Sequence, residues 1–112
     1  MKELKTLSRD ELGKILEEFK RGIRGILGDK LVEIILFGSC ARGDYQPGSD
    51  IDVSVIVTER LSEVEEGVIS DRATELSLKY DTVISFFEYR YQDYLEDETP
   101  FLMNVRKEEI RI

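Results

Sequence analysis

The feature that most constrains the fold is the change in apolar spacing along the chain. Between residues 12 and 27, apolar side chains recur every three or four positions, which is typical of one face of a helix. Ser8 and Glu11 form a capping box that predicts where this helix begins. Residues 31–37 are almost continuously apolar and rich in branched side chains, as in a strand that is covered on both faces. Gly38 ends that strand.

The same contrast continues through the rest of the chain. The remaining predicted elements are a strand over 51–57, a helix over 62–78, a strand over 80–88 and a last helix from 99 to 105, with residues 89–98 unassigned. Ser62 and Glu65 make a second capping box, and Thr99-Pro100 is a good helix start. Together with a short helical turn after Gly38, this order predicts an α/β (α+β) fold, with helices packed on a small sheet.

Length and composition exclude several classes of protein. The 112 residues are enough for one domain, over 1–112. The longest apolar run, residues 34–37, is far shorter than the roughly 20 residues of a membrane span. Cys40 is the single cysteine, which excludes an internal disulfide and a multi-cysteine zinc site. We therefore expect a cytoplasmic protein without a membrane segment.

The charged residues narrow the function further. The chain carries 16 Lys and Arg against 24 Asp and Glu, a net charge of −8, which makes nucleic acid an unfavourable partner. It has no histidine, so the usual general base and the imidazole ligands of zinc are missing. If the protein is an enzyme, carboxylates and a hard metal ion are the expected tools.

A candidate phosphate-binding turn follows the first predicted strand. Gly38 and Ser39 stand where that strand ends and a helical turn begins. Free backbone N–H groups at such a helix start attract phosphate, and a glycine allows an anion to approach the backbone closely. Arg42 lies about one turn later, where its guanidinium can add a cation for phosphate oxygens. A plain capped turn is the alternative interpretation of these residues taken alone.

Two carboxylates begin the second predicted strand. Asp50 and Asp52 are two residues apart, so their side chains leave the same face with Cα atoms roughly 6.6 Å apart. Paired carboxylates can hold magnesium together with substrate phosphates. A solvated turn before a strand is again the alternative for the pair alone.

The combination is more specific than either part. Gly-Ser, ten residues and then Asp-x-Asp would match by chance in a chain of this length with a probability on the order of one in a thousand. Residues 36–57 resemble the active-site signature of the DNA polymerase beta-like nucleotidyltransferase superfamily, and the short chain is most similar to its minimal nucleotidyltransferases. The resemblance implies the palm-like nucleotidyltransferase fold with a small mixed sheet.

The resemblance also implies roles for individual residues. Gly38 and Ser39 would hold the triphosphate of the nucleotide, and Asp50 and Asp52 would bind two Mg²⁺ ions. Family members use a third carboxylate on a following strand, which completes a metal site and helps to deprotonate the acceptor. Asp81 is the candidate for this metal-binding and catalytic role, with Glu88 as the alternative.

The function implied is transfer of a nucleoside monophosphate, AMP from ATP, to an acceptor hydroxyl with loss of pyrophosphate. Minimal nucleotidyltransferases are often paired with a HEPN-domain toxin, which makes such a protein the expected acceptor. A non-catalytic, antitoxin-like binding subunit with a vestigial or regulatory nucleotide site is the alternative, and transfer to a small molecule is a third. The sequence leaves the base preference and a homo-oligomer open.

Overall fold

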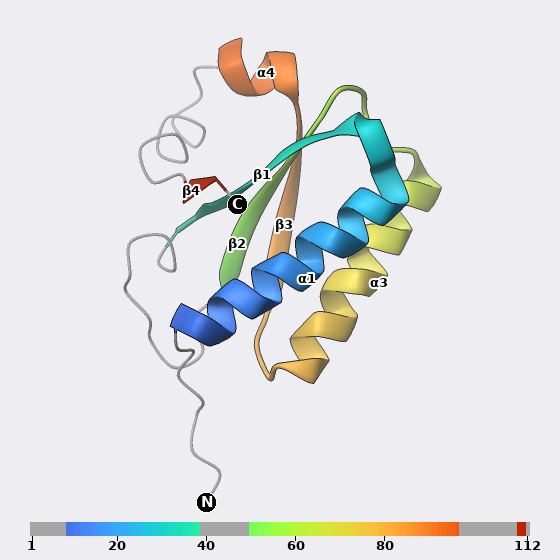
Figure 1. The fold of residues 1–112 in the computed structure, drawn as a ribbon. Coiled ribbons are helices and arrows are strands. Elements are labelled where there is room, and N and C mark those ends of the chain that lie inside the picture. The colour runs from blue at the N-terminus through green and yellow to red at the C-terminus, as the bar shows by residue number, and fades with distance from the viewer. Residues whose placement is uncertain (1–8, 39–49, 97–109, 112) are drawn as a thin grey trace, which may run out of the picture.

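The computed structural model describes residues 9–38, 50–96 and 110–111 (Figure 1). Its elements are α1 (Arg9–Leu27), the 3₁₀ turn η1 (Gly28–Lys30), β1 (Leu31–Phe37), β2 (Ile51–Val57), α3 (Glu63–Lys79), β3 (Ile84–Arg90), α4 (Tyr91–Glu96) and β4 (Ile110–Arg111). The predicted bounds of β1 and β2 are confirmed, and so is the fold class of a small mixed sheet with helices packed on it.

The sheet has the strand order β3-β2-β1-β4. Strand β1 runs antiparallel to both β2 and β4, whereas β2 and β3 are parallel. A parallel pair needs a crossover connection, and α3 provides it. One end of the sheet therefore gathers the end of β1, the start of β2 and the start of β3. We call this end the site end and the opposite end the far end.

Residues 34–37 of β1 are buried on both faces of the sheet, as their apolar run predicts. Figure 1 shows α1 and α3 side by side on one face. The core on that face is built from alternate strand residues and the apolar stripes of the two helices. Its fully buried members are Ile15, Phe19, Ile23, Ile34, Ile51, Val53, Val55, Val57 and Ile69. The other face carries a smaller cluster of Ile35, Phe37, Ile56 and Tyr94.

Helix α3 begins where the sequence predicts. The Ser62 hydroxyl accepts a hydrogen bond from the Glu65 N–H at 3.1 Å, and the Glu65 carboxylate accepts one from the Ser62 N–H at 2.9 Å. This is the predicted capping box, and it satisfies two backbone donors that a helix start leaves free.

The end of α3 corrects the predicted start of the third strand. That strand was expected at Tyr80, but β3 begins at Ile84, because a Schellman-type turn occupies the residues between. The Thr82 N–H bonds to the Ser77 carbonyl at 3.0 Å, and Asp81 has the left-handed φ of 51° that this turn requires. Asp81 stands where a glycine usually signals the end of a helix.

The last part of the chain contains elements that the sequence did not predict. Helix α4 lies within residues 89–98, for which the sequence predicts no element, and its Tyr94 is buried on the second face of the sheet. Strand β4 was also not predicted. The capping box at Ser8, the helical turn after Gly38 and the last helix from Thr99 lie outside the described residues.

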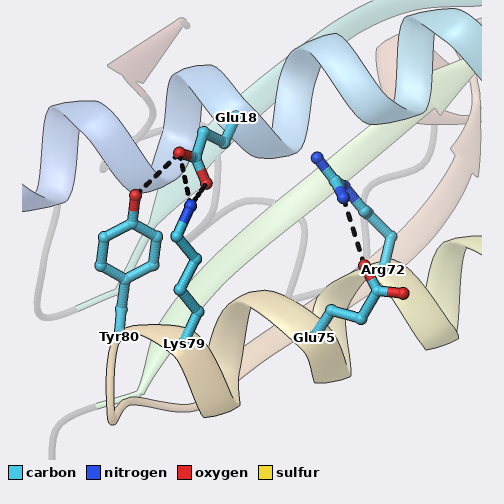
Figure 2. A network of polar contacts seen from close by, with 5 residues as sticks. All are labelled: Glu18, Arg72, Glu75, Lys79 and Tyr80. Carbon is cyan, nitrogen blue, oxygen red and sulfur yellow. Dashed lines mark hydrogen bonds and ion pairs between the residues drawn. The ribbon is translucent and has the colours of Figure 1, made fainter.

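A polar network ties the end of α3 to α1 (Figure 2). The Glu18 carboxylate accepts hydrogen bonds from the Tyr80 hydroxyl at 2.8 Å and from the Lys79 ammonium at 3.1 Å. The bond from Tyr80 is the main cause that lowers the pKa of Glu18, and Lys79 adds to it. One turn back along α3, Arg72 pairs with Glu75 at 3.2 Å. The network therefore fixes the turn that leads into β3.

Among the described helices, none combines the length and apolar character of a membrane span.

Candidate active site

The two parts of the sequence motif meet at the site end of the sheet. Antiparallel pairing sets Phe37 of β1 opposite Asp52 of β2, so Gly38 follows directly beside the aspartate. Gly38 has a φ of +78°, which side chains other than glycine rarely adopt. A Cβ at this position would lie 2.6 Å from Oδ2 of Asp52. Glycine is therefore favoured here by conformation, and a Cβ would in addition displace the end of the Asp52 side chain.

Asp50 and Asp52 are close enough to interact. Burial is the main cause that raises the pKa of Asp52, and the negative charge of Asp50 raises it further. Asp52 is partly buried on the sheet face that points away from α1 and α3, and Asp50 is exposed. Holding two carboxylates together with one of them partly desolvated is unfavourable without a cation. This donor set fits a divalent ion that takes its remaining ligands from water and substrate phosphates.

An aromatic pair borders the carboxylates, and the sequence did not predict it. The rings of Phe37 and Phe87 come from the strands on either side of β2, and their centroids are 5.6 Å apart. Phe37 is opposite Asp52, and Phe87 is opposite Ser54. Ser54 is fully buried, and its Oγ has no hydrogen-bond partner among the described residues. The apolar surroundings on this face are consistent with the desolvation of Asp52.

The structure places Asp81 at the site end but in the turn before β3. The residue is exposed and forms the left-handed cap of α3. Across residues 10–38 and 50–96, no three of His, Cys, Asp and Glu form a group that could hold a metal ion. Asp81 is thus not gathered with Asp50 and Asp52 into one metal-binding group. Its role as a third carboxylate stays a prediction.

Glu88 lies farther along β3, toward the far end of the sheet. It is opposite Val55, three residues beyond Asp52, which is about 10 Å along the strand. Its Oε2 accepts a hydrogen bond from the Leu61 N–H at 2.9 Å. Glu88 therefore fixes the connection that leads into α3. Ser39 and Arg42, the other predicted nucleotide-binding residues, lie outside the described part of the chain.

Comparison with known sequences identifies the family. The profile of the nucleotidyltransferase domain matches residues 12–111 of this chain. The chain belongs to the nucleotidyltransferase domain family. The resemblance of residues 36–57 to the nucleotidyltransferase signature is therefore confirmed.

Two relatives of this nucleotidyltransferase come from Methanocaldococcus jannaschii, and both are named putative protein adenylyltransferase. The first is 48% identical over 80 residues, which are 71% of this chain and 81% of the relative. The second is 38% identical over 72 residues, which are 64% of this chain and 67% of the relative.

Solved structures share the fold of this nucleotidyltransferase. Spectinomycin adenyltransferase AAD(9) from Enterococcus faecialis, with ATP and spectinomycin, has a TM-score of 0.67 and 22% identity, over 79% of this chain and 38% of that one. A toxin-antitoxin structure with AMP-PNP has a TM-score of 0.60 and 21% identity, over 85% and 70%. The complex of a tri-AMPylated Shewanella oneidensis HEPN toxin with its MNT antitoxin gives 0.57 and 19%, over 88% and 69%. At these identities the likeness establishes the fold alone.

Proposed function

We propose that this protein transfers AMP from ATP to a hydroxyl group of another protein. The observation that carries the proposal is that Gly38 lies beside Asp52 at the site end, with Asp50 close enough to raise the pKa of Asp52. The chain also belongs to the nucleotidyltransferase family. The names of the two Methanocaldococcus jannaschii relatives support a protein as the acceptor. In the reaction, a bond forms between the acceptor oxygen and the α-phosphorus, and the bond from that phosphorus to pyrophosphate breaks. The hydroxyl proton passes to water, helped by the predicted third carboxylate.

The predicted site residues bind the metal ions and the triphosphate, and the ions neutralise the phosphate charge. Asp50 and Asp52 would hold Mg²⁺, two ions by the family resemblance, and magnesium supplies positive charge against the phosphate oxygens. Gly38 leaves the backbone open to the triphosphate, whose other predicted contacts are the Ser39 amide and the Arg42 guanidinium. Asp81 is the predicted third carboxylate. Positioning and charge neutralisation are the main requirements of phosphoryl transfer, so the absence of histidine is no obstacle.

A HEPN-domain protein is the proposed acceptor. Among the solved structures of the same fold, one is a HEPN toxin that carries AMP groups in complex with an MNT antitoxin. By this proposal the protein acts as the antitoxin of such a pair, and it neutralises its partner by modifying it.

The test is the intact mass of the candidate partner after incubation with this protein, ATP and Mg²⁺. We expect AMP on the partner with the wild type and at least about a 100-fold slower transfer with Asp50→Asn/Asp52→Asn. Glu17→Gln/Glu75→Gln is the matched control, because it removes the same charge from exposed helix positions. Equal rates for wild type and the aspartate variant would refute the proposed site.

The absence of a three-carboxylate group within the described residues favours one second candidate. In that alternative, the protein is a non-catalytic binding subunit that neutralises its partner by docking. It predicts partner binding and neutralisation by wild type and by Asp50→Asn/Asp52→Asn alike, with no AMP on the partner in either case.

A further inference from the structure

Strand β3 determines which side chains lie beside the two carboxylates. The Ile51 N–H donates a hydrogen bond to the Val83 carbonyl at 2.8 Å, and the parallel register then sets Asp52 opposite Ser85. Val83 cannot bind a cation through its side chain, so Ser85 is the polar neighbour that β3 offers to Asp52. The sequence did not identify Ser85, because the predicted strand began four residues earlier.

Ser85 and Asp52 project from the same face of the sheet. Paired residues of neighbouring strands point the same way, so Phe37, Asp52 and Ser85 share a face. Phe87 is two residues beyond Ser85 and therefore lies on that face too, which its ring contact with Phe37 confirms. Neighbouring strands are about 4.8 Å apart, so the Ser85 and Asp52 side chains leave adjacent positions of the sheet on one face. Both side chains are partly buried, and both therefore remain within reach of a ligand at this end.

We propose that Ser85 is the third residue of the metal site, after Asp50 and Asp52. At this position of β3 the protein has a neutral hydroxyl where a carboxylate could stand. The location of the site rests on the proposed function, but the inference concerns how the ion is held. With a ligand charge of −2 from Asp50 and Asp52, the protein binds a divalent ion weakly on its own. It gains the ion together with the triphosphate, whose oxygens complete the ligand set.

The conformation of Asp81 supports this assignment. Asp81 is four residues before Ser85 and belongs to the cap of α3, where its φ of 51° serves the turn. Ser77 fixes the start of β3 from the same helix, because its hydroxyl accepts a hydrogen bond from the Ile84 N–H at 3.1 Å. The register that sets Ser85 beside Asp52 is thus held from the helix as well as from β2.

Binding of Mn²⁺, measured by the electron paramagnetic resonance signal of the free ion, tests the proposal. For the wild type without nucleotide we expect weak binding, tightened at least about tenfold by α,β-methylene-ATP. Ser85→Asp adds one negative charge beside the ion and should tighten nucleotide-free binding at least about tenfold. Ser85→Asn introduces the neutral isostere of that aspartate and should leave nucleotide-free Mn²⁺ binding within about twofold of wild type.

Two results would overturn the proposal. One is a wild type that binds Mn²⁺ as tightly without the nucleotide analogue as with it. The other is an Asp81→Asn variant that loses Mn²⁺ binding as severely as Asp52→Asn, because Asp81 would then be the third carboxylate.

If Ser85→Asp does not fold, Ser85→Cys provides the same test with Cd²⁺. It changes one atom, and we expect at least about tenfold tighter nucleotide-free Cd²⁺ binding than in wild type, since a thiolate is the stronger ligand for this soft ion. Unchanged Cd²⁺ binding would contradict the placement of Ser85. These readouts need no transfer reaction, so tightened binding without AMP on any partner would reject the proposed function and leave this inference intact.

Discussion

The two ends of the sheet both carry ion pairs, with Lys79 and Glu18 paired at the site end, but they differ in one use of charge. At the far end, Lys30 of η1 pairs with Glu65 of α3 at 2.7 Å, and Arg90 pairs with Asp93 at 2.8 Å. Glu88 accepts a backbone N–H. At the site end, two like charges are brought together, and burial raises the pKa of one of them.

Left-handed backbone occurs at both ends of the sheet. Gly38 and Asp81, with φ of 78° and 51°, lie at the site end, and Gly28, with φ of 57°, precedes β1 at the far end. Asp81 is the one residue other than glycine with such a φ in the described part of the chain. Residues held in unfavourable conformations or charge states are typical of functional sites, where the surrounding structure stabilises them. We therefore expect substitutions at the far end to change stability alone and substitutions at the site end to change activity first.

The largest effect is expected for Gly38→Ala. The new Cβ would be 2.6 Å from the Asp52 carboxylate and would force a side chain into a φ of +78°. We expect transfer to fall about 100-fold, because small displacements of reacting groups are costly, and the free energy of unfolding to fall by about 1 to 2 kcal/mol. Transfer kinetics and urea unfolding measure the two effects. Gly25→Ala, with open space around its Cβ position, is the control. An active Gly38→Ala variant would show that the close approach to Asp52 is unimportant.

Ser62→Ala tests the far end. It removes the acceptor for the Glu65 N–H and should lower the free energy of unfolding by about 1 kcal/mol, which is typical of a lost helix cap. Transfer by the folded protein should equal that of wild type. Ser62→Asp should restore stability, since aspartate is also a good N-cap. A loss of activity without a loss of stability would contradict the division between the two ends.

Asp81→Gly tests whether Asp81 serves as the cap of α3 alone or also as the third carboxylate. Glycine adopts a φ of 51° without strain, so the free energy of unfolding should stay within about 1 kcal/mol of wild type. If Ser85 is the third site residue, transfer should stay within a few-fold of wild type. A 100-fold loss of transfer in a stable Asp81→Gly or Asp81→Asn variant would instead support the predicted third carboxylate.

The smallest effect is expected from the pH dependence of the Lys30–Glu65 pair. The hydrogen bond from Lys30 is the main cause that lowers the pKa of Glu65 below its usual 4.5. A lowered pKa means that the pair stabilises the fold above pH 4.5 and loses this contribution as the pH falls through the lower value. Glu65→Gln should lower the melting temperature at pH 7 by about one to three degrees, with the difference vanishing in acid. Glu66→Gln is the matched control, and a difference that persists in acid would exclude the ion pair as its cause.

Much of the fold could be predicted because the sequence patterns that indicate its helices and strands each lie within a short stretch of the chain. The bounds of β1 and β2 follow from continuous and alternating burial, and the start of α3 follows from a capping box within four residues. The partners of β4 could not be predicted, because a two-residue strand depends on pairing with β1 across most of the chain. Helix α4 is short and rich in tyrosine, which has no strong preference for a helix.

Prediction of the site divides in the same way. Asp50 and Asp52 could be selected because their spacing is local, and the structure shows that they interact. The neighbour on β3 could not be identified, because the register depends on where that strand begins. The cap of α3 uses Asp81 in place of a glycine, which removed the usual signal for the end of the helix. The later start of β3, at Ile84, moves Asp81 from the predicted strand into the turn before it.

The contact between Gly38 and Asp52 also has a consequence for how the two positions vary. The atom that excludes a side chain at 38 belongs to the very aspartate that the proposed chemistry needs. In a deep mutational scan, the two positions should therefore show epistasis. A shortened residue at 52 would remove the displaced carboxylate but not the unfavourable φ at 38. The loss of stability in the double variant should therefore be smaller than the sum of the two single losses.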